Sequence, residues 1–292
     1  MLYSEIFRSI QGEGVYTGVP TTWLRLFGCN LECNGFGQKD PTDPSTYILP
    51  YKEIDLKHIA VPEQLPVFSY GCDSSYSWSK RFKKIQREGT SEEVALEMYQ
   101  WLHDNTTHVA FTGGEPLMKA GQKNIIKVLD ELNKLFIDDR GNPKPLTNVT
   151  FETNGTRPIS EELSRAFNKL DTEYFFSVSP KIWNTSGEKD KIFPEIVKGY
   201  QDASYINTVS EPQGQLKFVC NGSLASWSEI QRAVTQFRNA GVVYPIWIMP
   251  VGATEESQSE EIVKIIAEET MNRGWNVSAR VHCYIWGNEI GR

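Results

Sequence analysis

The sequence predicts an α/β protein, and within that class an incomplete, open (β/α)6 barrel of the TIM type. Short segments rich in β-branched and aromatic residues alternate about six times with segments of helical apolar spacing. This alternation is typical of parallel strands joined by right-handed helical crossovers. Six units fall short of the eight that close a full barrel, so we expect the barrel to be open. A chain of 292 residues is long enough for one such domain.

The strands are predicted from short runs of Val, Ile, Thr, Phe, Tyr and Trp that are bounded by turn residues. The first is Thr21–Phe27, which carries a charged residue, Arg25, among apolar neighbours. A charge in a buried strand needs a partner, so we expect Arg25 to pair with an acid or to bind an anionic ligand. The later strands are expected at His108–Thr112, Val149–Glu152, Tyr174–Ser179, Gln215–Cys220, Tyr244–Val251 and Ala279–Trp286.

The helices are predicted from capping residues and from apolar residues that recur every three or four positions. Thr90 with Glu93 has the spacing of a capping box, and we also expect Ser226 with Glu229 to begin a helix. Glycine after the last apolar position is a common stop signal. The expected helices run from Thr90 to about Asn105, over Gln122–Phe136, over Ser160–Leu170, from Ser226 to Gly241 and over Ser259–Arg273.

Three segments fit neither pattern. Glu5–Gly18 is polar and glycine-rich, and its simplest interpretation is a surface turn. The stretch from Trp183 to Gly214 is polar and variable. Residues 34–70 contain five prolines and no clear period, and a loop of that length is usually functional or carries short elements of its own. We therefore expect one domain over residues 1–292, with 34–70 as an insertion within a cysteine-bearing loop.

Three cysteines lie where such a barrel keeps its chemistry. Cys29 and Cys33 directly follow the first predicted strand, and Cys72 comes after the insertion. Thiolates at close spacing can hold a [4Fe-4S] cluster, and three ligands would leave one iron open. The same residues with His58 or another ligand would instead suit zinc, and unrelated thiols are a third interpretation. The spacing leaves these alternatives open.

Other polar groups also follow the carboxyl ends of predicted strands and are expected to meet at the same mouth. They are the segments 113–116 (Gly-Gly-Glu-Pro), 153–156 (Thr-Asn-Gly-Thr) and 179–181 (Ser-Pro-Lys). A glycine pair lets backbone donors approach a ligand closely, and Glu115 offers a carboxylate to an ammonium group. Together with the cysteines, they suggest an amino-acid-like ligand that chelates an open iron.

The composition argues against nucleic-acid-binding, membrane-spanning and secreted proteins. The net charge of -7 argues against a nucleic-acid-binding protein, which usually presents a basic face. We find neither a signal-peptide pattern at the start nor an apolar run of about 18 residues, so no membrane span is expected. Five cysteines are few and odd in number for a secreted scaffold, which favours a cytoplasmic location. Cys220 and Cys283 are interpreted as small buried hydrophobes.

Several motifs taken together resemble the 7-carboxy-7-deazaguanine synthase family of radical S-adenosylmethionine enzymes. They are, in order, EIFRSIQGEG (5–14), WLRLFGCNLEC (23–33), GCDS (71–74), TGGEPL (112–117), ETNGT (152–156), SPK (179–181) and HCYIWGNE (282–289). The first two are the most specific, because other radical enzymes share only the cysteines and the Gly-Gly-Glu turn. The resemblance extends over nearly the whole chain.

The resemblance implies a lyase of queuosine or other 7-deazaguanine (purine) biosynthesis. It implies a [4Fe-4S] cluster, S-adenosyl-L-methionine and Mg²⁺, and conversion of 6-carboxy-5,6,7,8-tetrahydropterin to 7-carboxy-7-deazaguanine with loss of ammonia. A 5′-deoxyadenosyl radical would start the rearrangement. The cofactor supplies this chemistry, so no side chain is assigned as a catalytic group. A homodimer and an external electron donor such as flavodoxin are implied in the same way.

The resemblance also assigns site residues. The implied metal ligands are Cys29, Cys33 and Cys72 for the cluster and Ser74 for Mg²⁺. The implied S-adenosylmethionine contacts are Gly71, Cys72, Asp73, Gly114, Glu115, Thr153, Asn154, Ser179, Pro180 and Lys181. The implied pterin contacts are Ile10, Gln11, Gly12, Arg25, Thr112 and His282. Arg25 is also favoured by its chemistry, because a planar guanidinium matches a carboxylate.

This chain departs from the family pattern at three points. The family's three cysteines usually lie close together, whereas here the insertion separates Cys33 from Cys72. Ser74 stands where threonine is usual, and it keeps the hydroxyl. Cys283 stands where lysine is common. Two rival functions stay open at this stage: another radical enzyme, such as a glycyl-radical activase, and a zinc-binding protein without catalysis.

Overall fold

One mixed sheet organises the part of the chain that the computed structural model describes, namely residues 1–292 without 103–106, 136, 138–145, 147, 168–171 and 205–212. The strand order is β3-β1-β2-β4-β5-β6-β7-β8-β9. β1 pairs antiparallel with β2 and β3, and every later neighbour is parallel. The strands are β1 (Leu2–Ile10), β2 (Pro20–Leu26), β3 (Arg87–Glu88), β4 (His108–Gly113), β5 (Asn148–Thr153), β6 (Glu173–Val178), β7 (Gly214–Cys220), β8 (Ile246–Pro250) and β9 (Asn276–Val277).

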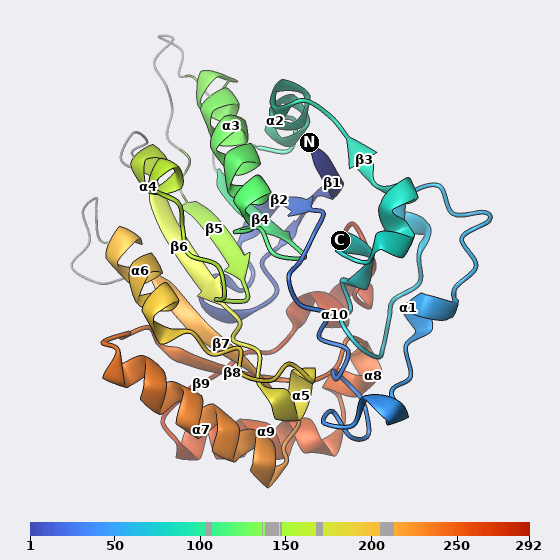
Figure 1. Cartoon of the computed structure of the whole chain (residues 1–292), viewed down its shortest axis with the longest axis vertical. Coiled ribbons are helices and arrows are strands. Elements are labelled where there is room, and N and C mark those ends of the chain that lie inside the picture. Colours follow the sequence, from blue (N-terminus) through green and yellow to red (C-terminus); the bar gives the residue numbers. More distant parts are fainter. Residues whose placement is uncertain (103–106, 136, 138–145, 147, 168–171, 205–212) are drawn as a thin grey trace.

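Helices cover the outer side of this sheet, and Figure 1 shows α3, α4, α6, α7 and α9 in an arc around it. The longer helices are α2 (Ser91–Tyr99), α3 (Lys119–Leu135), α4 (Glu161–Phe167), α6 (Pro194–Ser204), α7 (Leu224–Asn239) and α9 (Glu261–Asn272). The short ones are α1 (Pro50–Glu53), α5 (Trp183–Ser186), α8 (Glu255–Gln258) and α10 (Val281–Trp286). The predicted α/β class is confirmed. Within the described residues, no helix is long and apolar enough to cross a bilayer.

Alternation along the strands separates the core from the site. Leu24 and Leu26 of β2 lie in the main core, whereas Trp23 and Arg25, which alternate with them along the strand, line a cavity on the other face. β7 repeats this arrangement, with Phe218 in the core and Lys217 in the cavity. Successive strand residues point to opposite faces, so one short segment serves both purposes.

The capping box at Thr90 is confirmed, since Thr90 and Glu93 exchange side-chain and backbone hydrogen bonds. The cap of α7 is Ser223 and not Ser226: the Ser223 hydroxyl accepts from the Ser226 amide. The expected ends of three helices, at Asn105, Phe136 and Leu170, lie outside the described residues.

Two other expectations were wrong. Residues 5–10 continue strand β1, because Glu5 is buried and paired rather than exposed. Residues 281–286 form helix α10 rather than a strand, and the last strand is β9, just before it. A short apolar run does not by itself distinguish these two states. The stretch from Trp183 to Gly214 contains α5 and α6 in its described part.

The insertion has a small core of its own. It carries α1 and two 3-10 turns, η2 (Pro44–Thr46) and η3 (Pro62–Gln64), as expected for a segment of this length. Its apolar side chains form a cluster with residues that follow Cys72, consisting of Tyr51, Leu65, Phe68, Tyr76, Phe82 and Ile85. Burying these aromatic side chains folds the insertion back on itself. The two ends of the insertion are thereby held together.

Candidate active site

A cavity opens at the carboxyl ends of the parallel strands. Most of the predicted site residues line it: Ile10, Gln11, Arg25, Cys29, Cys33, Gly71, Cys72, Asp73, Ser74, Thr112, Gly114, Thr153, Asn154, Ser179, Lys181 and His282. Gly12, Glu115 and Pro180 are the predicted residues that do not line it. Loops that follow different strands therefore meet at one mouth, as parallel β/α units require.

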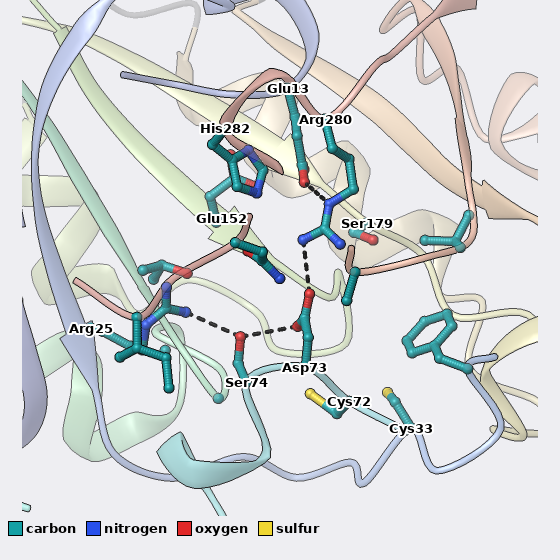
Figure 2. Close-up of a pocket in the computed structure, with 18 of the residues that line it drawn as sticks. Glu13, Arg25, Cys33, Cys72, Asp73, Ser74, Glu152, Ser179, Arg280 and His282 are labelled. Atoms are coloured by element: carbon teal, nitrogen blue, oxygen red, sulfur yellow. Dashed lines mark hydrogen bonds and ion pairs between the residues drawn. The ribbon is translucent and has the colours of Figure 1, made fainter. Parts of the chain in front are cut away.

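The cysteine side of the cavity is built from Cys29, Cys33 and Cys72. The Gly71 amide donates to the Phe36 carbonyl (2.8 Å), which brings the two ends of the insertion together. The Gly28 amide donates to the Ser77 carbonyl (2.7 Å). These backbone bonds place Cys72 beside the first two cysteines, and Figure 2 shows Cys33 and Cys72 at the same end of the cavity.

Burial is the largest influence on the pKa values of these three thiols. It raises the pKa of Cys29 to about 12, that of Cys72 to about 11, and that of Cys33 well above its usual range. Such thiols are protonated at neutral pH and become thiolates when a metal displaces the proton. Among the described residues, no three His, Cys, Asp or Glu side chains converge as ligands of a single ion. In a [4Fe-4S] cluster each cysteine thiolate binds a different iron, so these three thiols could serve as ligands of such a cluster.

The Gly-Gly-Glu turn packs directly against the cysteine loop. A Cβ atom on Gly114 would lie 2.3 Å from the Gly28 carbonyl oxygen and 2.7 Å from Cys29 Cβ. The Glu115 amide also donates to the Gly28 carbonyl (2.8 Å). Only glycine allows this approach, so the turn and the cysteine loop form one rigid unit.

Glu115 points into the protein and not into the cavity. Its carboxylate accepts hydrogen bonds from the Leu117 amide (2.9 Å), the Thr153 hydroxyl (2.8 Å) and the Asn154 amide (2.7 Å). Burial raises its pKa and these donors oppose that rise. Glu115 therefore ties the loop after β4 to the loop after β5, and presents Thr153 and Asn154 to the cavity.

The other side of the cavity is a network of ion pairs. Lys217 Nζ lies 2.5 Å from a Glu13 oxygen and 3.2 Å from a Glu152 oxygen. Arg280 donates to Glu13 (2.9 Å) and to Asp73 (2.8 Å), and Figure 2 shows it between these two carboxylates. Asp73 follows Cys72 directly, so Arg280 connects the charged side to the cysteine side.

This network fixes the charges of its members. Burial alone would raise the pKa of Glu13, but Lys217 and Arg280 outweigh it and hold that pKa well below its usual range. Burial alone would lower the pKa of Lys217, and Glu13 and Glu152 outweigh it. At neutral pH, the cavity therefore presents ionised carboxylates next to cations that are already paired.

Arg25 lies in the same cavity and has an internal partner. Its Nε donates to Glu5 (2.6 Å), and a terminal nitrogen donates to the Ser74 hydroxyl (3.2 Å). The Ser74 hydroxyl in turn donates to Asp73 (3.1 Å), and the Tyr76 hydroxyl donates to Glu5 (2.8 Å). The expected acid partner is thus found, and the guanidinium still faces the cavity.

His282 closes the cavity from the carboxyl-terminal end of the chain. A Cβ atom on Gly12 would lie 1.9 Å from its ring, so the imidazole packs directly on that glycine backbone. Burial first, and then Arg280, lower the pKa of His282 to about 4. The imidazole is therefore neutral at pH 7 and has a hydrogen-bonding nitrogen to offer.

Four residues of the cavity were not predicted from the sequence, namely Glu13, Glu152, Lys217 and Arg280. Lys217 carried a usable signal, because it is a cation in the middle of a predicted buried strand, as Arg25 is. Glu13 and Glu152 lay inside motifs that were assigned through other residues. Arg280 fell in a segment that was predicted to be a strand.

No family model matches this chain. Individual proteins do: it is 26% identical to a 7-carboxy-7-deazaguanine synthase of Pyrobaculum aerophilum, over 99% of this chain and 96% of that protein. It is 23% identical to the enzyme of the same name from Leptospira interrogans, over 98% and 96% of the two chains. The solved structure of QueE from Escherichia coli has a similar fold, with a TM-score of 0.53 and 17% identity over 96% of this chain and 94% of that one. The resemblance indicated by the sequence motifs is therefore confirmed over nearly the whole chain, and this protein is a relative of the 7-carboxy-7-deazaguanine synthases.

Proposed function

We propose that this protein converts 6-carboxy-5,6,7,8-tetrahydropterin to 7-carboxy-7-deazaguanine with loss of ammonia, as a radical S-adenosylmethionine lyase of 7-deazaguanine biosynthesis. One observation carries this proposal: three of the five cysteines line one end of a cavity whose other end is a charged, polar network. Cys220 and Cys283 are buried elsewhere and do not line it. Three thiols suit a cluster that keeps one iron open, and the polar end suits a pterin.

Cys29, Cys33 and Cys72 would hold the [4Fe-4S] cluster. Bound there with S-adenosylmethionine, the cluster supplies a 5′-deoxyadenosyl radical. Gly114, Thr153, Asn154, Ser179 and Lys181 line the wall next to the cysteines and would orient the amino and carboxylate groups of the cofactor. The fixed turn at Gly113–Gly114 offers backbone groups at close range, which is what an amino-acid-like ligand requires.

The pterin would lie against the charged side. Ile10, Gln11 and Thr112 line that side, and Gln11 is held by Glu152 through its amide nitrogen (2.8 Å). Arg25 keeps one nitrogen on Glu5 and is able to turn its free edge from Ser74 to the substrate carboxylate. His282, neutral and packed on Gly12, would donate or accept at the ring edge.

Ser74 and Asp73 would provide the oxygen ligands for Mg²⁺. A hydroxyl beside a carboxylate has the hard-donor chemistry that this ion prefers. The Ser74 hydroxyl also accepts from Arg25 (3.2 Å), so the residues that would hold Mg²⁺ lie next to the group that would bind the substrate carboxylate.

The parallel strands β2 to β8 with their outer helices support a partial (β/α)6 barrel as the finer description of the fold. A cytoplasmic location, a homodimer and a flavodoxin-like electron donor remain parts of the proposal that come from the family.

The test is anaerobic reconstitution with iron and sulfide, followed by incubation of the reduced protein with S-adenosylmethionine and the carboxytetrahydropterin. We expect a brown protein with absorbance near 400 nm, about four irons per chain, and 7-carboxy-7-deazaguanine detected by mass spectrometry. Cofactor cleavage without this product would favour another radical enzyme, such as an activase. A colourless protein with one zinc would contradict the proposal.

A further inference from the structure

The loop that carries Cys33 is held from outside the cavity by one carboxylate. A single oxygen of Glu188 accepts hydrogen bonds from the backbone amides of Glu32 (2.9 Å) and Cys33 (3.0 Å). Glu188 lies between α5 and α6, in a stretch that the sequence marked only as polar. Among the described groups, it is the side chain that binds the Cys33 backbone amide.

Glu188 is itself held in place by neighbouring backbone contacts. The Glu188 amide donates to the Ser186 hydroxyl (3.1 Å), and the Gly35 amide donates to the Ser186 carbonyl (2.9 Å). A Cβ atom on Gly35 would lie 2.5 Å from the Gly187 nitrogen, so the two backbones are in direct contact. The segment 186–188 therefore packs along the cysteine loop on both sides of Cys33.

Helix α7 supports this segment in turn. The Glu229 carboxylate of α7 accepts from the backbone amides of Trp183 (2.8 Å) and Asn184 (2.9 Å) at the start of α5. A carboxylate on the exposed amides of a helix start is a favourable arrangement. A continuous set of contacts thus runs from α7 through α5 to Glu188 and Cys33.

Cys33 needs such support. Its φ of 52° lies in the left-handed region, which is sterically unfavourable for a residue with a side chain. Hydrogen bonds from amides to an ionised carboxylate are stronger than neutral ones and are able to offset that strain. Without them, the loop is expected to relax and turn the Cys33 sulfur away from the other two.

We propose that Glu188 is a positioning residue for the iron–sulfur cluster, an inference that rests on the proposed function. It holds Cys33 in its strained conformation, and its charge beside the Cys33 thiolate disfavours the addition of an electron to the cluster. Because it also engages the Cys33 amide, that amide is not free to donate to a sulfur. Both effects lower the reduction potential, which depends on nearby charge and on hydrogen bonds to sulfur.

The test compares Glu188→Ala, Glu188→Gln and a control, Glu195→Ala, whose carboxylate lies on α6 away from the cavity. Each protein is reconstituted and exposed to an iron chelator, and the 400 nm absorbance is followed. Glu188→Ala removes both hydrogen bonds, and loss of one such bond already corresponds to about a tenfold change, so we expect this variant to lose its cluster at least about tenfold faster than the wild type. The control is expected to match the wild type.

The Gln variant separates geometry from charge. Its amide oxygen still accepts from the two backbone amides, so its cluster should persist nearly as long as the wild type's, while the midpoint potential measured by redox titration should rise. Equal chelation rates for the Ala variant and the wild type, or an unchanged potential in the Gln variant, would overturn the inference. If wild-type protein takes up no cluster at all, the proposed function fails instead, and the two failures are thereby distinguished.

Discussion

The two sides of the cavity are held by different forces. On the cysteine side, the loops are fixed by backbone hydrogen bonds, close glycine contacts and buried acceptors such as Glu115. On the opposite side, ion pairs among Glu13, Lys217 and Arg280 fix both geometry and charge. The first arrangement suits a group bound covalently through sulfur, and the second suits a polar molecule recognised by charge and hydrogen bonds.

Because different forces hold the two sides, the two functions should be separable by mutation. Loss of the cysteine side should leave pterin binding intact, and loss of the charged side should leave the cluster intact. Arg280 is the bridge between them, since it contacts both Glu13 and Asp73.

The largest effect is expected for Cys72→Ala. Removing one of three thiolates should abolish cluster retention and product formation, while the fold and pterin binding persist. Iron content, circular dichroism and equilibrium binding of the pterin provide the measurements. A retained cluster would show that the third ligand lies elsewhere, and lost pterin binding would contradict the separation of the two sides.

Lys217→Met tests the charged side. It leaves Glu13 and Glu152 buried without their shared cation, and breaking a buried pair in this way destabilises by about 3–5 kcal/mol. We expect kcat/KM to fall by about 100-fold or more, comparable to the loss of one preorganised polar contact, with normal iron content.

Lys264→Met is the matched control, because Lys264 forms an exposed pair with Glu261 on α9. It should behave as the wild type in both assays. Iron loss in Lys217→Met would mean that the charged side also supports the cluster.

Gly114→Ala tests the contact between the glycine turn and the cysteine loop. The new methyl group meets backbone at 2.3 Å, which no side-chain rotation relieves. We expect cofactor cleavage to fall by about tenfold, a loss of roughly 1.4 kcal/mol, with pterin affinity unchanged. Gly199→Ala on α6, where a methyl group meets nothing within 4 Å, is the control and should lose neither activity nor stability.

The last prediction concerns stability rather than activity and involves His108, which lies at the start of β4. Its Nε2 hydrogen-bonds the Thr150 hydroxyl (2.8 Å), and burial lowers its pKa to about 4. The unfolded chain takes up this proton near pH 6.5 and the folded chain only near pH 4, so folding stability falls as the pH drops through that window. The contribution is at most about 3 kcal/mol.

Urea unfolding between pH 7 and pH 4 checks this for the wild type and for His108→Gln. His282 titrates in the same window and is present in both proteins, so it cancels in the comparison. As the pH falls from 7 to 4, we expect the wild type to lose unfolding free energy relative to His108→Gln. A difference that stays constant with pH would contradict the assignment.

Particular residues show where the sequence was sufficient. The alternation of apolar strands and capped helices predicted the α/β class, and polar residues after strand ends predicted one mouth. Arg25 is a charged residue within an apolar strand, which predicted an acidic partner, and that partner is Glu5. These inferences depend on local periodicity and on the cost of burying a charge, and both can be read along the chain.

Other features needed the tertiary structure. Glu13 and Arg280 stand 267 positions apart, and Glu13 and Lys217 stand 204 apart, so no local pattern links them. The motif predicted that Glu115 binds a ligand, but its side chain points into the protein, where its carboxylate accepts three hydrogen bonds.

By itself, the sequence determined the strand–helix order, the cysteines available and the strand ends from which the site is built. Only the tertiary structure decided that Cys72 returns across the insertion, that β1 is a strand and α10 a helix, and which charges pair. The physical reason is that local preferences set by side-chain periodicity are short-range, whereas ion pairs and the packing of a long insertion are settled when distant segments meet.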